Sequence, residues 1–225
     1  MKKIKFLMMA VVALLTASTF VACGDDDDDS KGGQQSNMER YQQEVDATVK
    51  SQKKNDKAIL VVAFGSTWQQ AYDAFDLTVE EYKKEFPGYD VYLSFSSAIC
   101  INRAMAGEHV KPRNFYEPKY WLEAFGRVQY KEIIVQSMQV IPGEEYTRVI
   151  NAMKDFANNS NGDLDDKYLS TMTLKLGYPL MAEYPSDVNK LAKALNDNFS
   201  SYAQKGALLF MGHGNPDTYD TYKAN

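Results

Sequence analysis

Short apolar runs alternate with longer amphipathic stretches from residue 57 onward. Residues 58–64 are apolar at every position, which is typical of a strand buried on both faces of a parallel sheet. Similar runs predict further strands over 92–95, 132–136, 169–176 and 207–211. The stretches between them predict helices over 68–85, 97–106, 117–128, 146–156 and 187–199. This alternation predicts an α/β fold, with a largely parallel sheet flanked by helices.

The segment before the first strand is polar. Residues 30–37 have the composition of a flexible linker. Residues 38–53 favour a helix but carry few apolar anchors, so a loosely docked helix is predicted there. We therefore expect the folded body to begin near Lys57.

The N-terminus has the pattern of an export signal. Three lysines precede the apolar run 6–15, which is too short to span a bilayer, and small residues then lead to Cys23. The pattern resembles a bacterial lipoprotein signal over residues 1–22, with Cys23 as the lipidated first residue; an ordinary secretory signal is the alternative. Five aspartates at 25–29 predict an extended acidic tether within 23–56. We expect an exported lipoprotein of the outer membrane, periplasmic or surface-facing, held to the membrane by its lipid alone.

Composition and charge limit the classes of partner that are expected. The 225 residues are 44% hydrophobic and 24% charged, as in ordinary globular proteins, and the net charge is −5. No basic stripe is present, so nucleic acid is not expected as a partner. With Cys23 lipidated, Cys100 has no partner for a disulfide, and its apolar surroundings indicate a small buried residue without a catalytic role.

Chemistry is expected where the strands end, because ligands of parallel sheets bind outside the carboxyl ends. Three polar loops fall there, at 65–67, 137–145 and 212–214. Ser66 and Thr67 precede a helix and can bind an anion at its N-terminus or cap it. The loop lacks the fuller glycine pattern of a nucleotide site, and capping explains it adequately.

His213 lies between Gly212 and Gly214 at the end of an apolar run. Glycines on both sides let a ligand approach the backbone closely. An imidazole in this place can bind a metal or act as a base near neutral pH, while a structural histidine is the alternative. His109 lies in a polar, charged loop and is expected to be solvated.

Two carboxylates, Glu144 and Glu145, open the helix that follows the loop 137–143. One of them is explained by the helix macrodipole, and the other can face His213 across a cleft. A carboxylate and an imidazole together can hold a divalent cation and move protons. Two ligands are too few for a closed metal site.

Four segments occur in an order and spacing that resemble one family, namely 64–67, 135–146, 176–180 and 210–214. They resemble the anaerobic sirohydrochlorin cobaltochelatases of the CbiK type, class II tetrapyrrole chelatases, over residues 57–225. The resemblance implies two α/β lobes with a tetrapyrrole between them. Residues 57–204 would form the first lobe and 205–225 the start of the second, most of which is expected to be absent. The uncovered strand edge would then lead to poor stability or to pairing with another copy.

The resemblance also implies roles for individual residues. His213 would bind the metal and accept protons from the pyrrole nitrogens, and Glu145 would lie in the same cleft. The tetrapyrrole, sirohydrochlorin or a haem-like ring, would contact Ser66, Thr67, Gln139, Gly212 and Gly214. Gln139 stands where many members have histidine, and an amide cannot act as a general base. The metal, Co²⁺ or Fe²⁺, is a substrate, no organic cofactor is expected, and further metal ligands would lie beyond Asn225.

Three functions follow from these residues. The first is a chelatase that inserts Co²⁺ or Fe²⁺ into sirohydrochlorin or a similar tetrapyrrole. The second is an exported lipoprotein that binds haem, another tetrapyrrole or metal for uptake without catalysis, and the third is an inactive fragment. His213 and Glu145 favour the enzyme, whereas export and Gln139 favour the carrier. We expect the enzyme.

Overall fold

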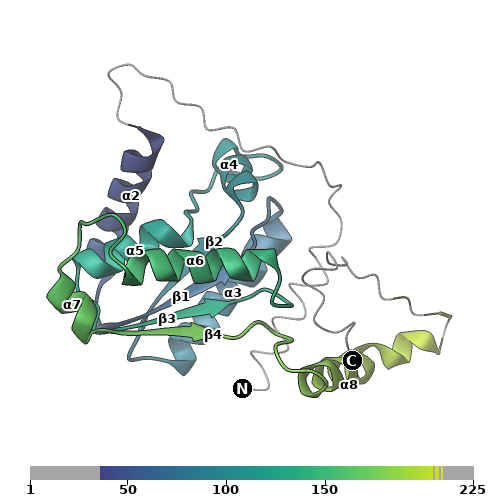
Figure 1. The fold of residues 1–225 in the computed structure, drawn as a ribbon. Helices are drawn as coiled ribbons and strands as arrows, with labels where there is room; N and C mark the ends of the chain where they lie inside the picture. Colours follow the sequence, from purple (N-terminus) through teal and green to yellow (C-terminus); the bar gives the residue numbers. More distant parts are fainter. Residues whose placement is uncertain (1–35, 205, 208, 210–225) are drawn as a thin grey trace.

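The computed structural model describes residues 36–204, 206, 207 and 209, and its centre is a single sheet (Figure 1). The sheet has the order β2-β1-β3-β4, and each neighbouring pair of strands is parallel. The strands are β1 (Lys57–Ala63), β2 (Asp90–Phe95), β3 (Glu132–Ser137) and β4 (Thr173–Gly177). The predicted α/β fold with a parallel sheet is confirmed.

Helices cover both faces of the sheet (Figure 1). They are α2 (Asn37–Gln52), α3 (Gln69–Glu85), α4 (Ala98–Ala106), α5 (Pro118–Arg127), α6 (Glu144–Ala157), α7 (Asp166–Thr171) and α8 (Ser186–Ala203). Side chains of α2, α5 and α6 pack on one face, against Ala58, Leu60 and Val62 of β1. The residues between these on β1 point to the other face, where α3 lies. This alternation explains why β1 is apolar throughout.

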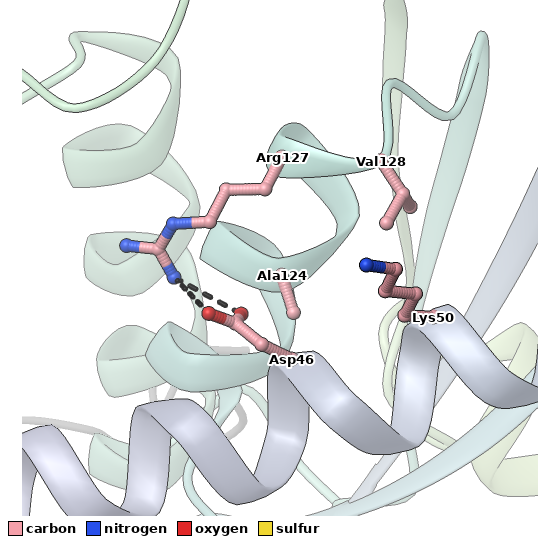
Figure 2. Close-up of a pocket in the computed structure, with 5 residues that line it drawn as sticks. All are labelled: Asp46, Lys50, Ala124, Arg127 and Val128. Atoms are coloured by element: carbon pink, nitrogen blue, oxygen red, sulfur yellow. Dashed lines mark hydrogen bonds and ion pairs between the residues drawn. The ribbon is translucent and has the colours of Figure 1, made fainter.

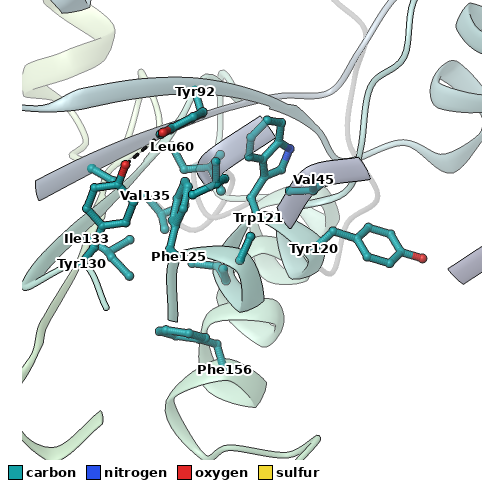
Figure 3. Packing of buried hydrophobic residues seen from close by; sticks show 14 of the residues in the cluster. Val45, Leu60, Tyr92, Tyr120, Trp121, Phe125, Tyr130, Ile133, Val135 and Phe156 are labelled. Atoms are coloured by element: carbon teal, nitrogen blue, oxygen red, sulfur yellow. Dashed lines mark hydrogen bonds between the residues drawn. The ribbon is translucent and has the colours of Figure 1, made fainter. Parts of the chain in front are cut away.

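The larger core cluster is built around aromatic side chains of α5 (Figure 3). The fully buried ring of Phe125 lies 5.1 Å from that of Tyr92 and 5.3 Å from that of Tyr130, measured between centroids. The hydroxyls of Tyr92 and Tyr130 are 2.9 Å apart and share a hydrogen bond inside this cluster. The core therefore joins β2 to the segment between α5 and β3 by a hydrogen bond between buried hydroxyls as well as by ring contacts.

The helix before the first strand is firmly packed, and the prediction of a loosely docked helix is wrong. α2 begins at a capping box formed by Ser36 and Glu39. Its Val45 and Val49 are fully buried in the core cluster. The Tyr116 hydroxyl donates a hydrogen bond to the Glu44 carboxylate. Two valines four residues apart suffice to bury one face of a helix, so the few apolar residues misled the prediction.

The strand predicted over 169–176 is wrong in its first half. The Asp165 side chain accepts a hydrogen bond from the Lys167 amide and starts α7, which continues to Thr171. The Tyr168 hydroxyl donates to the Tyr130 carbonyl at 2.8 Å and holds this short helix against the core. β4 is therefore limited to Thr173–Gly177.

The strand predicted over 207–211 falls largely outside the described residues. α8 stands apart from the layered body, on the side toward which the strands point (Figure 1), and none of its residues is buried. Among the helices that the structure describes, none is both long and apolar enough to cross a membrane.

Glu132 makes the stability of the sheet dependent on pH. Its carboxylate lies 2.6 Å from the Lys175 ammonium and 3.1 Å from that of Lys57, and these two cations lower its pKa from 4.5 to about 2. Because the pKa of the folded state is the lower one, the stabilisation is present above pH 4.5 and is lost as the pH falls toward 2. We expect Glu132→Gln to be less stable than the wild type at pH 6, with a difference that shrinks toward pH 2. Urea unfolding at several pH values measures the free energy of unfolding of both proteins. A difference between them that did not change with pH would contradict the low pKa of Glu132.

Candidate functional site

Polar side chains and backbone groups gather where the four parallel strands end. The loops are joined to one another there, since the Ser96 amide donates to the Ala63 carbonyl at 2.9 Å and the Met138 amide to the Val62 carbonyl at 2.8 Å. Polar residues at this edge are Ser66, Thr67, Ser96, Ser97, Ser137 and Gln139, and all but Gln139 are buried. We call this set of loops the carboxyl edge. It brings Ser66, Thr67 and Gln139 to one end of the sheet, as predicted from their places after the carboxyl ends of parallel strands.

The loop after β1 turns sharply at Gly65, whose φ of +120° is rarely adopted by other residues. A Cβ at this position would lie 2.7 Å from the Cys100 Cβ, so the loop packs closely on α4. Burial raises the pKa of the half-buried Cys100 thiol, which disfavours the reactive thiolate form. The sequence predicted a buried residue here, and the structure places Cys100 only partly out of solvent.

Ser66 and Thr67 do not cap α3, so the capping interpretation is wrong. The N-cap residue is Trp68, which has no side-chain capping bond, and the Ser66 hydroxyl accepts a hydrogen bond from the Trp68 amide at 3.2 Å. The hydroxyl thus fixes the loop one residue before the helix. Ser66 and Thr67 remain candidate contacts for a ligand at this edge.

Gln139 lies between the ends of β3 and β2, across the end of β1. Its amide nitrogen donates to the Ser96 hydroxyl at 3.5 Å, and its amide oxygen accepts from the Ser137 hydroxyl. Its backbone carbonyl accepts from the Leu180 amide at 3.0 Å, which ties the loop to the segment after β4. The side chain is therefore oriented by its neighbours and offers an amide, without a titrating proton, to a ligand.

The two carboxylates of the first turn of α6 differ in their surroundings. Glu144 is exposed and forms an ion pair with Arg148 at 2.8 Å, one turn along the helix. Glu145 is half-buried and has no hydrogen-bond or ion-pair partner among the residues that the structure describes. Glu145 is therefore the carboxylate that is free to accept a proton or to bind a cation.

Exposed aromatic rings are the feature of this edge that the sequence did not indicate. Phe64 is 43% exposed, Trp68 51% and Tyr178 75%, and all three lie just beyond the ends of strands. His109 is exposed, as the prediction of a solvated residue expects, and its ring stacks on Trp68 at 4.6 Å between centroids. A flat apolar ligand would find several ring surfaces here.

The predicted metal-binding segment Gly212, His213 and Gly214 lies outside the described residues, and so does Cys23. Within 36–204, 206, 207 and 209, no group of three His, Cys, Asp or Glu side chains could hold a metal ion. Glu145 is thus one carboxylate that would need ligands from elsewhere to bind a cation tightly.

A hollow of about 260 Å³ lies between α2 and α5 (Figure 2). It is lined by Asp46, Lys50, Ala124, Arg127 and Val128. Both carboxylate oxygens of Asp46 accept hydrogen bonds from one Arg127 nitrogen at 3.0 Å. Since α5 ends here just before β3 begins, the hollow lies at the opposite end of the strands from the carboxyl edge. Its charged groups join α2 to α5 and leave no unpaired acid for catalysis.

Comparison with known proteins identifies similar sequences. A sequence model of the family described as cobalt chelatase (CbiK) matches residues 57–224. The chain is 30% identical over 161 residues to the sirohydrochlorin cobaltochelatase CbiKC of Nitratidesulfovibrio vulgaris, covering 70% of this chain and 51% of that protein. It is 25% identical over 159 residues to the sirohydrochlorin cobaltochelatase of Salmonella typhimurium, covering 70% of this chain and 54% of that protein. The chain thus spans about half the length of these relatives.

Proposed function

Because the chain belongs to the cobalt chelatase (CbiK) family, we propose that it inserts a divalent metal, Co²⁺ or Fe²⁺, into sirohydrochlorin or a similar tetrapyrrole. The observation that carries this proposal is the family match over residues 57–224, which includes all four strands and the loops of the carboxyl edge. The relatives' names supply the substrate class.

Metal insertion requires that two N–H protons leave the macrocycle as the cation enters. A metal ligand and a proton acceptor must therefore work on one face of the ring. His213 is proposed to hold the metal and to take protons, because a neutral imidazole can do both in turn. Glu145 is proposed as the second acceptor, and the absence of a partner for it among the described residues supports this role.

The remaining predicted residues are proposed to bind the macrocycle. Gln139 is held by Ser137 and Ser96 and presents an amide that can hydrogen-bond but cannot take a proton at neutral pH. Ser66 and Thr67 would contact the ring from the loop after β1, and Gly212 and Gly214 would let it approach the backbone. The proposed reaction uses no organic cofactor.

A non-catalytic tetrapyrrole carrier is the second candidate. The observation that favours it is Gln139, which places an amide at the centre of the carboxyl edge where a base would assist deprotonation. A carrier needs only the aromatic and polar contacts of the edge, not a proton acceptor.

We further propose that the protein is exported and that Cys23 is lipidated, with the five aspartates at 25–29 as the tether. Because α2 is packed on the body, the tether would join the folded part at Ser36. Palmitate labelling of cells that express the wild type or Cys23→Ala tests this anchor.

A visible-absorbance titration tests the function. The full chain, purified in detergent, is mixed with sirohydrochlorin and Co²⁺ alongside His213→Ala and Glu145→Gln. We expect metal-dependent conversion of the spectrum faster than in protein-free buffer, lost in His213→Ala and slowed in Glu145→Gln. Glu144→Gln is the matched control, since Glu144 already pairs with Arg148, and it should react like the wild type.

The other outcomes separate the alternatives. A spectral shift on adding the tetrapyrrole alone, without faster metal insertion, would replace the enzyme by the carrier. No shift with either reagent would contradict both and leave a fragment without activity.

A further inference from the structure

We propose that Trp68, backed by His109, is a stacking surface for one flat face of an acidic tetrapyrrole, and that Lys111 pairs with carboxylates of that ring. The proposal rests on the proposed function, and it adds to the carboxyl edge a binding surface that the predicted site residues do not include.

Trp68 is exposed where a ligand can reach it. It directly follows the loop Gly65–Thr67 at the end of β1, and 51% of its surface is accessible, whereas Trp121 in the core is 7% accessible. Its backbone is fixed by the bond from its amide to the Ser66 hydroxyl. A large aromatic ring held in water at the edge of a site is typical of a binding surface.

His109 holds one face of the indole. The two rings are nearly parallel, at an angle of 9° and a centroid distance of 4.6 Å. The His109 backbone has a φ of 70°, in the left-handed region that residues other than glycine rarely adopt. Its Nε2 lies 3.3 Å from the Glu108 carboxylate, which also pairs with Arg103 at 3.4 Å. The imidazole is thus oriented from two sides, and Trp68 stays exposed although one of its faces is covered.

The charge beside this stack suits an acidic ligand. Arg103 pairs with Glu108, and Arg113 pairs with Asp76. Lys111, two residues after His109, is exposed and has no ion-pair partner within the described part of the chain. It is therefore a cation available to the carboxylate side chains that sirohydrochlorin carries.

The apolar surface extends beyond one ring. Phe64, at the end of β1, and Ile99, in the first turn of α4, are also exposed at this edge. Ser97 joins the Phe64 backbone to the first turn of α4, since its amide donates to the Phe64 carbonyl at 3.0 Å and its hydroxyl accepts from the Cys100 amide. A macrocycle is wider than a single indole, so neighbouring apolar groups are needed for it to rest on this edge.

The test measures binding of metal-free sirohydrochlorin to the full chain in detergent, from the absorbance of the ligand. We expect Trp68→Ala to weaken binding about tenfold, as removal of an aromatic stacking partner does elsewhere, and Trp68→Phe to retain most of the affinity. Lys111→Gln should weaken binding about threefold and reduce its dependence on salt. Leu77→Ala is the matched control, because Leu77 is a similarly exposed apolar residue further along α3.

Hydroxyl-radical footprinting read by mass spectrometry supplies a second measurement on the unaltered protein. Bound sirohydrochlorin should protect Trp68 and leave Leu77 as reactive as before. If the wild type binds while Trp68→Ala binds equally well and Trp68 is not protected, the stacking surface is wrong and the proposed function stands. If the wild type does not bind sirohydrochlorin at all, both proposals fail.

Discussion

Replacing Gly65 by alanine is expected to lower the free energy of unfolding by about 3–5 kcal/mol, because two costs add at one position. The first is backbone strain, since a φ of +120° is rarely adopted by a residue with a side chain. The second is overlap, because the new Cβ would lie 2.7 Å from the Cys100 Cβ and 2.9 Å from the Phe95 ring. The loop Gly65–Thr67 would have to move away from α4, so binding at the carboxyl edge should also weaken.

Alanine substitutions at two other glycines distinguish the cost of backbone strain from the cost of overlap. Gly162→Ala meets no atom within 4 Å but has a φ of +72°, so it measures strain of about 1 kcal/mol without overlap. Gly88→Ala meets no atom and has no such φ, and its stability should stay within about 0.5 kcal/mol of the wild type. Urea unfolding of the three variants ranks them directly. If Gly65→Ala proved as stable as Gly162→Ala, the close packing of this loop on α4 would be contradicted.

Asp90→Ala is expected to cost about 3 kcal/mol, because Asp90 accepts four hydrogen bonds at the start of β2. The donors are the Tyr130 hydroxyl at 2.6 Å, the Lys54 amide at 2.9 Å, and the Asn55 amide and side chain at 3.0 and 2.9 Å. Burial alone would raise the pKa of Asp90, but these hydrogen bonds outweigh it and lower the pKa, so the carboxylate stays charged. Removing it would leave the hydroxyl of the fully buried Tyr130 with the Tyr92 hydroxyl in place of a carboxylate acceptor.

Chemical denaturation followed by circular dichroism measures the loss of unfolding free energy in Asp90→Ala. Two further variants serve as comparisons. Asp90→Asn keeps one acceptor oxygen and should lose less than Asp90→Ala. Asp76→Ala removes an exposed carboxylate that pairs with Arg113, and it should cost at most about 1 kcal/mol. Equal losses in Asp90→Ala and Asp76→Ala would show that the buried network at β2 contributes no more than a surface ion pair.

The same network explains why the packing of α2 could not be predicted. Lys54 and Asn55 follow this helix, and both bind Asp90, which lies 36 and 35 residues away in the sequence. Val45 and Val49 reach the core only because α5 provides the surface that they cover. Neither contact leaves a periodic signal in the polar segment 38–53, where hydropathy alone favours a loosely attached helix.

The candidate site also has features that the sequence predicted and features that only the structure shows. The order of strands and loops placed Ser66, Thr67 and Gln139 at one edge, because all carboxyl ends of a parallel sheet lie together. The sequence left Glu144 and Glu145 equivalent, and the structure distinguishes them by the ion pair between Glu144 and Arg148. His109 is exposed, as predicted, but its stack on Trp68 could not be predicted because it joins positions 41 residues apart.

The sequence by itself determined the α/β class, the parallel strands and the edge at which chemistry is expected, and its motifs indicated the chelatase family. These features depend on the periodicity of neighbouring residues, which follows from the geometry of a helix turn or a pleated strand. Tertiary structure alone decided that α2 belongs to the core, that α7 replaces half of a predicted strand, that Glu145 has no partner within the part of the chain that the structure describes, and that Trp68 carries His109 on one face. Each of these depends on which distant side chain fills the adjacent space, and close packing of the whole chain determines that choice.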